Sequence, residues 1–389
     1  MNSANWGPVD EPERYTSLDL VRGFALSGVL LVNLLYFFRI SLFAHIFQFH
    51  SHDGWLNHAI DFAVAEFVEF KAFGLFSLTF GVGVAVQAER AASRGVRVEL
   101  FLARRFLILL AVGACHMVLV SNVDILMLYA LCGLLMIPVL RLPAAVLAIA
   151  GIAAIYLPSL VATWPSESAM RADAVNATRI YSTGGFWEIV RFRWSETREL
   201  IVPILRSVAQ NSFGMMLLGA AVWRCGAIRE PERYRLWLWT VCGFAGAIGL
   251  INTTAHLLSR SSVLEKLGSH VPLAIAYGAG LLAWRRAKRA QGFTAVAAAA
   301  GQMALTNYLT QSVVLAVLFY GYGFGLFGRL EQWTGAAIGV VIYGMQVWFS
   351  AWWMARYRFG PFEWAWRSMT YGRWQPMRRF AGPAGAVER

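Results

Sequence analysis

Charged side chains are scarce in this chain: Asp, Glu, Lys and Arg make up 14% of its 389 residues, whereas hydrophobic residues make up 58%. A soluble domain of this size carries far more charge on its surface, so the composition excludes that class and predicts an all-α membrane protein with many spanning helices. Acidic residues are fewer than basic residues, 22 against 34, and the net charge is +12. The basic residues stand in short clusters between apolar runs, which is typical of topology signals and excludes nucleic acid as a partner.

Cysteine is also rare. The four cysteines stand singly in apolar runs without CxxC spacing, so they predict neither a disulfide nor a metal site. The histidines of the first outer loop are not spaced with thiolates as metal ligands are, and we expect no metal. The first 17 residues lack the basic segment of a cleavable signal peptide, so the first helix is expected to stay in the protein.

Ten apolar runs of about twenty residues predict ten transmembrane helices. They lie near residues 18–38, 61–88, 103–121, 124–141, 143–163, 200–223, 235–258, 268–284, 295–320 and 334–355. Arginine and lysine gather between spans two and three, six and seven, and eight and nine, on the side of both chain ends, which predicts cytoplasmic termini.

The chain is thus predicted to be a single transmembrane domain. It consists of a cytoplasmic tail (1–17), spans one to five (18–163), a periplasmic loop (164–199), spans six to ten (200–355) and a cytoplasmic amphipathic tail (356–389). Arginines in the 164–199 loop count against this orientation, but three clusters outweigh one loop. The phasing of Phe186, Trp187, Ile189 and Val190 predicts an amphipathic helix on the outer membrane surface.

One polar face runs the length of the first predicted helix. Asp19 and Arg22 lie one turn apart at its start, and Asn33, eleven residues after Arg22, returns to nearly the same face. Polar groups within a membrane helix face protein or water rather than lipid, which makes them candidates for a functional site. The alternative is a salt bridge at the helix start and an amide used in packing.

The second span carries two carboxylates, Glu66 and Glu69, at a spacing that places them on one face of a continuous helix. A dry site would raise the pKa of at least one of them, which would make it a candidate general base. The alternative is a neutralising pair of Glu69 with Lys71, or a solvated helix end.

A histidine and an aspartate stand on either side of the turn between the third and fourth spans. His116 lies just over one helical turn before that turn, and Asp124 opens the next helix, so the hairpin is expected to bring them into contact. A histidine oriented by a carboxylate is a common general base near neutral pH. The alternative makes Asp124 the N-cap of the fourth span and His116 a core residue, and one aspartate has oxygens enough for both roles.

Two later spans also carry polar side chains. Arg206 lies in the outer half of the sixth span, while Asn307 and Gln311 share a face of the ninth near mid-membrane. Together with the first three spans they would line a polar cavity that opens outward and binds a substrate. The alternative is packing through interhelical hydrogen bonds, which is the commoner role of lone amides in membrane helices.

Several stretches carry a resemblance to a known family: LDLVRGFALSGVLLVN, FGLFSLTFGVG, HMVLVSNVDILMLYA, GQMALTNYLTQSVV and RFGPFEWAWRSMTYG. Over essentially the whole chain they resemble the YeiB-like bacterial membrane proteins, whose C-terminal half is a domain of unknown function. The first stretch is similar, more distantly, to the heparan-α-glucosaminide N-acetyltransferase type of membrane protein and to bacterial O-acyltransferases of envelope sugars. The resemblance implies the bacterial cytoplasmic (inner) membrane and transfer of an acyl group from cytoplasmic acyl-CoA.

The resemblance also implies roles for single residues. The catalytic asparagine of the acetyltransferase relatives maps onto the position of Asn33, and their catalytic histidine follows soon after in the outer loop. His50 and His52 compete for that place here, whereas His116 matches the YeiB-like pattern better. We therefore prefer His116 as the base and keep the two loop histidines as alternatives.

The sequence thus predicts an integral membrane acyltransferase. His116, oriented by Asp124, would remove a proton from an acceptor hydroxyl or amine, and Asn33 would stabilise the tetrahedral oxyanion. Arg22, beside Asp19, would hold the phosphates of acyl-CoA, of which acetyl-CoA is the simplest. Membrane lipids and a small-molecule acceptor are the expected partners, and a homodimer is left open.

A transporter or flippase for a small amphiphile or envelope precursor is the alternative function. It would use the same polar cavity, with Glu66 and Glu69 as proton-coupling groups. The lack of an internal sequence repeat counts slightly against it.

Overall fold

The structure is a computed structural model that describes residues 16–46, 54–121, 124–157, 166–230, 232–259, 270–284 and 291–379. Within these ranges the chain is helical, and extended backbone pairs only in an isolated bridge between Tyr357 and Arg378. The helices in chain order are α1 (Thr16–Asn33), the π-helix η3 (Leu34–Phe38), α2 (Leu42–Ile46), α3 (Trp55–Phe67), α4 (Lys71–Ser93), α5 (Val98–Leu119), α6 (Ile125–Val139), α7 (Ala144–Tyr156), α8 (Glu167–Thr183), α9 (Phe186–Arg224), α10 (Arg235–Ser259), α11 (Val271–Trp284), α12 (Gln291–Gln302), α13 (Ala304–Phe319), α14 (Gln332–Met354) and α15 (Pro361–Tyr371).

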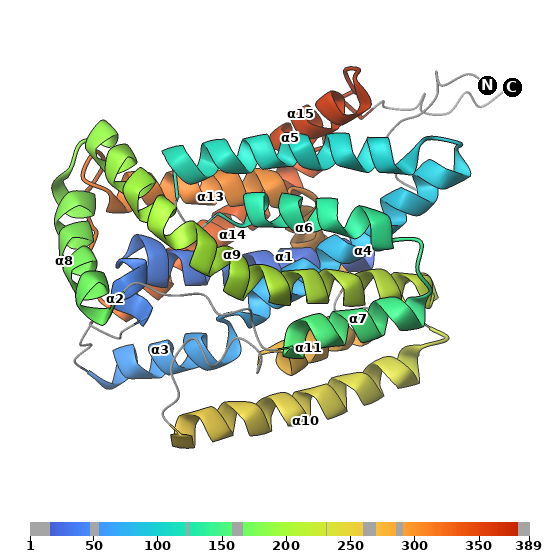
Figure 1. The fold of residues 1–389 in the computed structure, drawn as a ribbon, viewed down its shortest axis with the longest axis horizontal. Helices are drawn as coiled ribbons and strands as arrows, with labels where there is room; N and C mark the ends of the chain where they lie inside the picture. Colours follow the sequence, from blue (N-terminus) through green and yellow to red (C-terminus); the bar gives the residue numbers. More distant parts are fainter. Residues whose placement is uncertain are drawn as a thin grey trace, which may run out of the picture.

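The long helices lie roughly parallel to one another along the long axis of the molecule (Figure 1). Helices α2 and α8 lie at one end of this bundle, and the chain passes from α9 to α10 at the other end (Figure 1). The most extensive packing joins α4 to α9, α10 to α11, α1 to α12 and α7 to α9. Helix α1 also contacts α4, α11, α13 and α14, so most of the residues that it carries lie inside the bundle.

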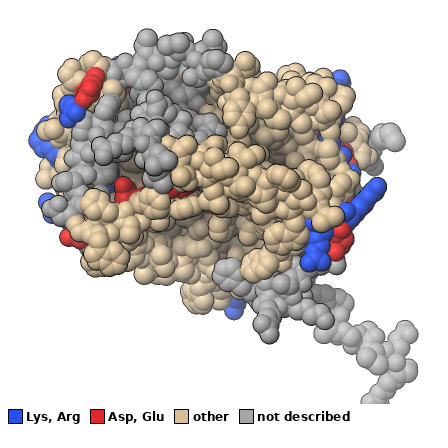
Figure 2. Space-filling model, turned by 90° about the horizontal axis from the view of Figure 1, so that it is seen from below, with Lys and Arg blue, Asp and Glu red and all other residues tan. Residues whose placement is uncertain are grey.

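Length and composition identify a membrane protein. Among the described residues, four helical segments are long and apolar enough to cross a bilayer, or five if the bent pair α12 and α13 forms one span. Large apolar side chains are exposed on the outer helices, for example Phe244 on α10 (71%) and Trp348 on α14 (70%). Figure 2 shows a face on which charged residues lie mostly toward the two ends, as a surface that contacts lipid requires.

Two predicted spans are broken rather than continuous. The run 61–88 is divided between α3 and α4, and Phe70 between them has a φ of 58°. The run 295–320 bends by 79° between α12 and α13, around Met303. Neither break lies at a proline, the usual cause of a sharp kink, so the apolar pattern gave no sign of either break.

The predicted outer loop 164–199 is helical over most of its described length. Helix α8 begins after Ser166, whose hydroxyl accepts a hydrogen bond from the backbone N–H of Ala169 (3.3 Å). The expected surface helix around Phe186 is the first turn of α9, which continues without interruption into the predicted sixth span. Its 39 residues give a length of about 58 Å, nearly twice the apolar thickness of a bilayer, so part of α9 lies outside the membrane.

Helices α1 and α12 approach each other closely through glycine. A Cβ atom at Gly301 would overlap the carbonyl oxygen of Asp19, and one at Gly23 would overlap the carbonyl oxygen of Ala297. Small residues at such a crossing let two membrane helices pack with their backbones in contact. This contact fixes the start of α1, with Asp19 and Arg22, beside the bend that follows α12.

Candidate functional site

His116 and Asp124 are in contact, as the hairpin spacing predicted. His116 Nδ1 lies 2.7 Å from Asp124 Oδ2, and both side chains are buried. Asp124 also caps α6, since its Oδ1 accepts a hydrogen bond from the backbone N–H of Met127 (2.7 Å). Gly113 permits this arrangement, because a Cβ there would lie 2.8 Å from Asp124 Oδ1 and would overlap the N–H of Met127. One aspartate therefore serves both roles that the sequence left open.

The other ring nitrogen of His116 is available for chemistry. With Nδ1 bound to the carboxylate, Nε2 is the atom left to accept a proton. Within the described part of the chain, this buried Nε2 has no hydrogen-bond partner. Buried nitrogens without a partner are uncommon in folded proteins, and Nε2 is therefore the candidate acceptor of a substrate proton.

Tyr308 joins this pair to a cavity, and the sequence did not predict its contact with Asp124. Its hydroxyl lies 3.4 Å from Asp124 Oδ2 and 3.4 Å from the backbone nitrogen of Ile125, and its ring centroid lies 5.2 Å from that of His116. The same tyrosine lines a cavity of about 160 Å³. Nothing local in the sequence indicates this role, because Tyr308 and Asp124 are 184 residues apart.

The cavity wall combines basic and aromatic groups. Arg22, Arg105 and Arg367 contribute guanidinium groups, and Glu363 contributes a carboxylate. The remaining wall is mainly apolar and aromatic and includes Phe76, Phe80, Phe106, Leu109, Tyr129 and Trp366. Such a wall suits a ligand that carries both an anionic group and an apolar group.

The surroundings of Arg22 agree with both interpretations of this residue: a salt bridge at the start of the helix and a contact with a ligand. Its Nη1 lies 3.2 Å from Asp19 Oδ1, as in the salt bridge proposed for the helix start. Its Nη2 donates to the carbonyl oxygen of Thr79 (3.4 Å), and the guanidinium lines the cavity, where a ligand can reach it. Asp19 is buried, so it orients the arginine rather than meeting a ligand itself.

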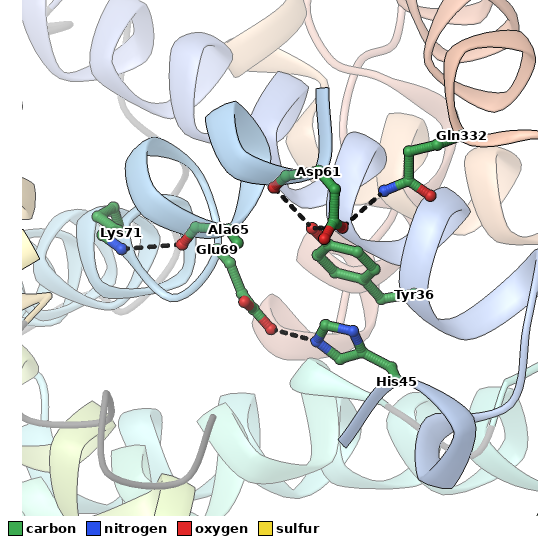
Figure 3. A network of polar contacts seen from close by, with 7 residues as sticks. All are labelled: Tyr36, His45, Asp61, Ala65, Glu69, Lys71 and Gln332. Carbon is green, nitrogen blue, oxygen red and sulfur yellow. Dashed lines mark hydrogen bonds and ion pairs between the residues drawn. The ribbon is translucent and has the colours of Figure 1, made fainter. Parts of the chain in front are cut away.

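A second histidine–carboxylate pair lies in a network around the π-helix (Figure 3). His45 Nε2 lies 2.6 Å from Glu69 Oε1, and the His45 ring stacks on Tyr36 with centroids 3.8 Å apart. The Tyr36 hydroxyl lies 3.1 Å from Asp61 Oδ1, which also accepts a hydrogen bond from Gln332 Nε2 (3.0 Å). The sequence pointed to other loop histidines, His50 and His52, which lie outside the described residues.

This network corrects the interpretation of the second span. Helix α3 ends before Glu69, so Glu66 and Glu69 do not share a face of one helix. The neutralising pair of Glu69 with Lys71 does not form either: Glu69 binds His45, and Lys71 Nζ donates to the carbonyl oxygen of Ala65 (3.1 Å). A non-glycine residue with a positive φ, Phe70, lies between them, and such strained residues gather at functional sites.

The amides of the ninth span are used in packing. Asn307 Nδ2 donates to Ser350 Oγ (2.9 Å), and Gln311 Nε2 donates to Gln346 Oε1 (2.6 Å), so both tie α13 to α14. Neither residue lines the cavity of Tyr308, and both make interhelical hydrogen bonds of the kind that the alternative predicted.

The remaining predicted residues lie apart from the cavity or outside what is described. Asn33 is buried where α1 passes into the π-helix, an irregularity frequent at functional sites, and it makes no hydrogen bond to His116 or Asp124. Arg206 lies on α9, but its side chain is outside the described residues. Among the residues that are described, no group of three or more His, Cys, Asp or Glu side chains is arranged to hold a metal ion.

A third buried cluster, which the sequence did not indicate, joins α8 to α9 outside the predicted spans. The Tyr181 hydroxyl donates a hydrogen bond to Glu196 Oε2. Burial, reinforced by the carboxyl group of Asp173, raises the pKa of Glu196 to about 8. Arg193, also buried, donates to the carbonyl oxygen of Val118 (3.1 Å), two residues after His116.

Comparison with known proteins gives relatives without an assigned activity. Residues 222–373 match the family described as "Protein of unknown function (DUF418)". The uncharacterized protein YxaH of Bacillus subtilis is 30% identical over an alignment of 392 positions, which covers 94% of this chain and 96% of the relative. An uncharacterized 39.9 kDa protein of Bacillus acidopullulyticus is 29% identical over 95% of this chain and 97% of its own. The uncharacterized protein YeiB of Escherichia coli is 28% identical, with 96% and 98% covered.

Proposed function

The chain belongs to the YeiB-like family of bacterial membrane proteins, and from the geometry of its site we propose that it is an integral membrane acyltransferase. It passes an acyl group from cytoplasmic acyl-CoA to a hydroxyl or amine of an envelope or extracellular acceptor, which is a sugar, a lipid or a small molecule. One observation carries the proposal: a buried histidine, oriented by a carboxylate, lies beside a tyrosine that lines an arginine-bearing cavity.

The His116 imidazole is the general base of the proposed reaction. Its Nε2 takes the proton of the acceptor as the acceptor oxygen or nitrogen attacks the thioester carbonyl, and the Asp124 carboxylate stabilises the imidazolium that forms. The tetrahedral intermediate then collapses and releases the CoA thiolate. Asn33, the donor to the oxyanion that the family resemblance implies, is buried before the π-helix and apart from the cavity lining, so the proposed step does not use it.

The cavity is the proposed place of the donor. Arg22 and Arg367 supply charge for the phosphates of CoA, and the aromatic wall near Tyr308 accommodates the acyl thioester. The proposal includes ten spans in the bacterial inner membrane, cytoplasmic chain ends, and membrane lipids around the bundle. The arginine-rich connections between the apolar runs support that orientation.

Thiol release tests the proposal. The purified protein, in detergent and supplied with acetyl-CoA, should release free CoA thiol at a rate that rises when membrane lipids or envelope sugars are added as acceptors. Arg22→Ala should weaken CoA binding by about 1.5–3 kcal/mol, the contribution of a hydrogen bond to a charged group. If no short acyl-CoA gives thiol release with any class of acceptor, the proposal is wrong.

The bend between α12 and α13 favours the second candidate, a transporter or flippase. Broken helices whose ends meet inside the bundle are a recurrent feature of transporters. In that function the buried pair of Glu69 and His45 is the proton-coupling group, because both partners are titratable and lie together beside a helix break. Uptake or flipping of an amphiphile by reconstituted protein, without thiol release, is the result that distinguishes it.

A further inference from the structure

Helix α15 forms part of the cavity wall, although it lies in the C-terminal tail beyond the predicted spans. Glu363, Trp366 and Arg367 line the cavity, and their spacing places them on one face of the helix. A neighbouring face is open, with Phe362 and Met369 each 45% exposed. Helix α15 therefore lies across the cavity with its polar and aromatic face inward.

Glu363 attaches α15 to the bend. Its Oε1 accepts hydrogen bonds from the backbone N–H groups of Leu305 (2.7 Å) and Thr306 (3.1 Å), and its Oε2 accepts one from Thr306 Oγ1 (2.5 Å). These N–H groups lack helical partners because α13 begins only at Ala304. A carboxylate at this position satisfies them and complements the positive end of the helix dipole.

Trp366 provides the second attachment. Its Nε1 donates to the carbonyl oxygen of Arg105 (3.0 Å), and the Arg105 guanidinium carbon lies 3.5 Å from the centroid of the indole ring. Both Glu363 and Trp366 thus hold α15 by side-chain contacts with α13 and α5. Glycines bound the helix at both ends, Gly360 as its N-cap and Gly372, with a φ of 69°, as its C-cap.

We infer that α15 is a movable cover of the cavity, closed in this structure by Glu363 on α13 and Trp366 on Arg105, and that the ligand enters when these contacts open. The rest of the wall comes from α1, α4, α5, α6, the end of α12 and the start of α13, which pack within the bundle. Helix α15 is the wall element outside the spans, so it is the one that can move without disturbing the membrane-embedded packing. The inference concerns access to the cavity and does not depend on acyl transfer.

Cysteine labelling tests the cover. Thr79 lines the cavity and is 1% exposed, so a cysteine at this position can react with a thiol reagent only when the cavity opens. The probe is Thr79→Cys in a protein whose four native cysteines are replaced by serine. Its rate of reaction with N-ethylmaleimide measures opening. Glu363→Ala and Trp366→Ala should each raise that rate at least tenfold. Glu363→Gln keeps an acceptor oxygen for the N–H groups and should stay near the parent rate, as should Met369→Ala on the open face.

Native Cys132 supplies the control for general loosening. It is buried (1%) and does not line the cavity, so a protein that keeps only this cysteine reports opening of the bundle itself. Its labelling rate should be unchanged by Glu363→Ala and by Trp366→Ala. The inference is overturned if neither alanine variant changes labelling at position 79, or if labelling of Cys132 rises in parallel.

Discussion

His116 and Asp124 are joined across the turn between α5 and α6, with 2.7 Å between Nδ1 and Oδ2, while the second oxygen of the same carboxylate caps α6. The cap holds the aspartate in place without any help from the histidine. The carboxylate therefore fixes which ring nitrogen carries the proton and leaves Nε2 with the lone pair. This is the arrangement that a general base requires.

The first prediction concerns this base. His116→Ala should lower acyl transfer by about 10²–10⁴-fold, the usual contribution of a general base, and should leave CoA binding nearly unchanged, because the base acts on the acceptor. Asp124→Asn should reproduce part of the loss, since an amide oxygen still caps α6 but cannot stabilise an imidazolium. Initial rates of thiol release and CoA titration measure the two effects.

Rival histidines serve as controls for that assignment. His45→Ala, His50→Ala and His52→Ala should each retain most of the activity. If His116→Ala keeps full activity and one of these three loses it, the histidine that was replaced is the base. That base is then either His45, which contacts Glu69, or one of the two histidines of the predicted first outer loop. If all four variants keep activity, the acyltransferase proposal loses its base and the transporter takes its place.

The second prediction tests the orientation in the membrane. The predicted topology places Ser51 in the first outer loop, whereas Ser93 lies at the end of α4, beside the first arginine cluster. In a cysteine-free background, Ser51→Cys should react with a membrane-impermeant thiol reagent in intact cells, and Ser93→Cys should react only after lysis. The reverse pattern would exchange the donor and acceptor sides of the proposed reaction.

Sequence reasoning succeeded where the signal is local. Apolar runs predicted the helices, and the tight turn between His116 and Asp124, which are eight positions apart, predicted their contact. It failed where distant segments decide the structure. The contact of His45 with Glu69 depends on a break at Phe70 that no proline or glycine announces, and the contact of Glu363 with Thr306 joins residues 57 positions apart.

The third prediction uses the buried carboxyl group between α8 and α9. The pKa of Glu196 rises from 4.5 to about 8, so the folded protein keeps a proton that the unfolded chain releases between these values. The stabilising contribution is therefore complete below about pH 4.5 and is lost as the pH rises to about 8, with a slope of at most about 1.4 kcal/mol per pH unit. Thermal unfolding in detergent from pH 5 to pH 8 measures it.

Glu196→Gln is the matched variant for that measurement. Glutamine keeps the shape and an acceptor oxygen for the Tyr181 hydroxyl but has no proton to release. Its unfolding temperature should depend less steeply on pH than that of the parent, with the largest difference between them at pH 8. Identical pH profiles for the two proteins would show that Glu196 does not titrate in this range.

The last prediction links packing to the site. Gly301→Ala places a methyl group on the backbone of α1 at Asp19, which cannot move aside as a flexible side chain can. We expect a loss of about 1–3 kcal/mol of stability from overpacking, together with weaker CoA binding, because α1 carries Arg22 into the cavity. Gly344→Ala on α14 is the control: nothing lies within 4 Å of the added methyl, so CoA binding should match the parent, and stability should be equal or up to about 1 kcal/mol higher because alanine favours a helix over glycine. Equal stability of the two variants would mean that α1 and α12 do not pack through Gly301.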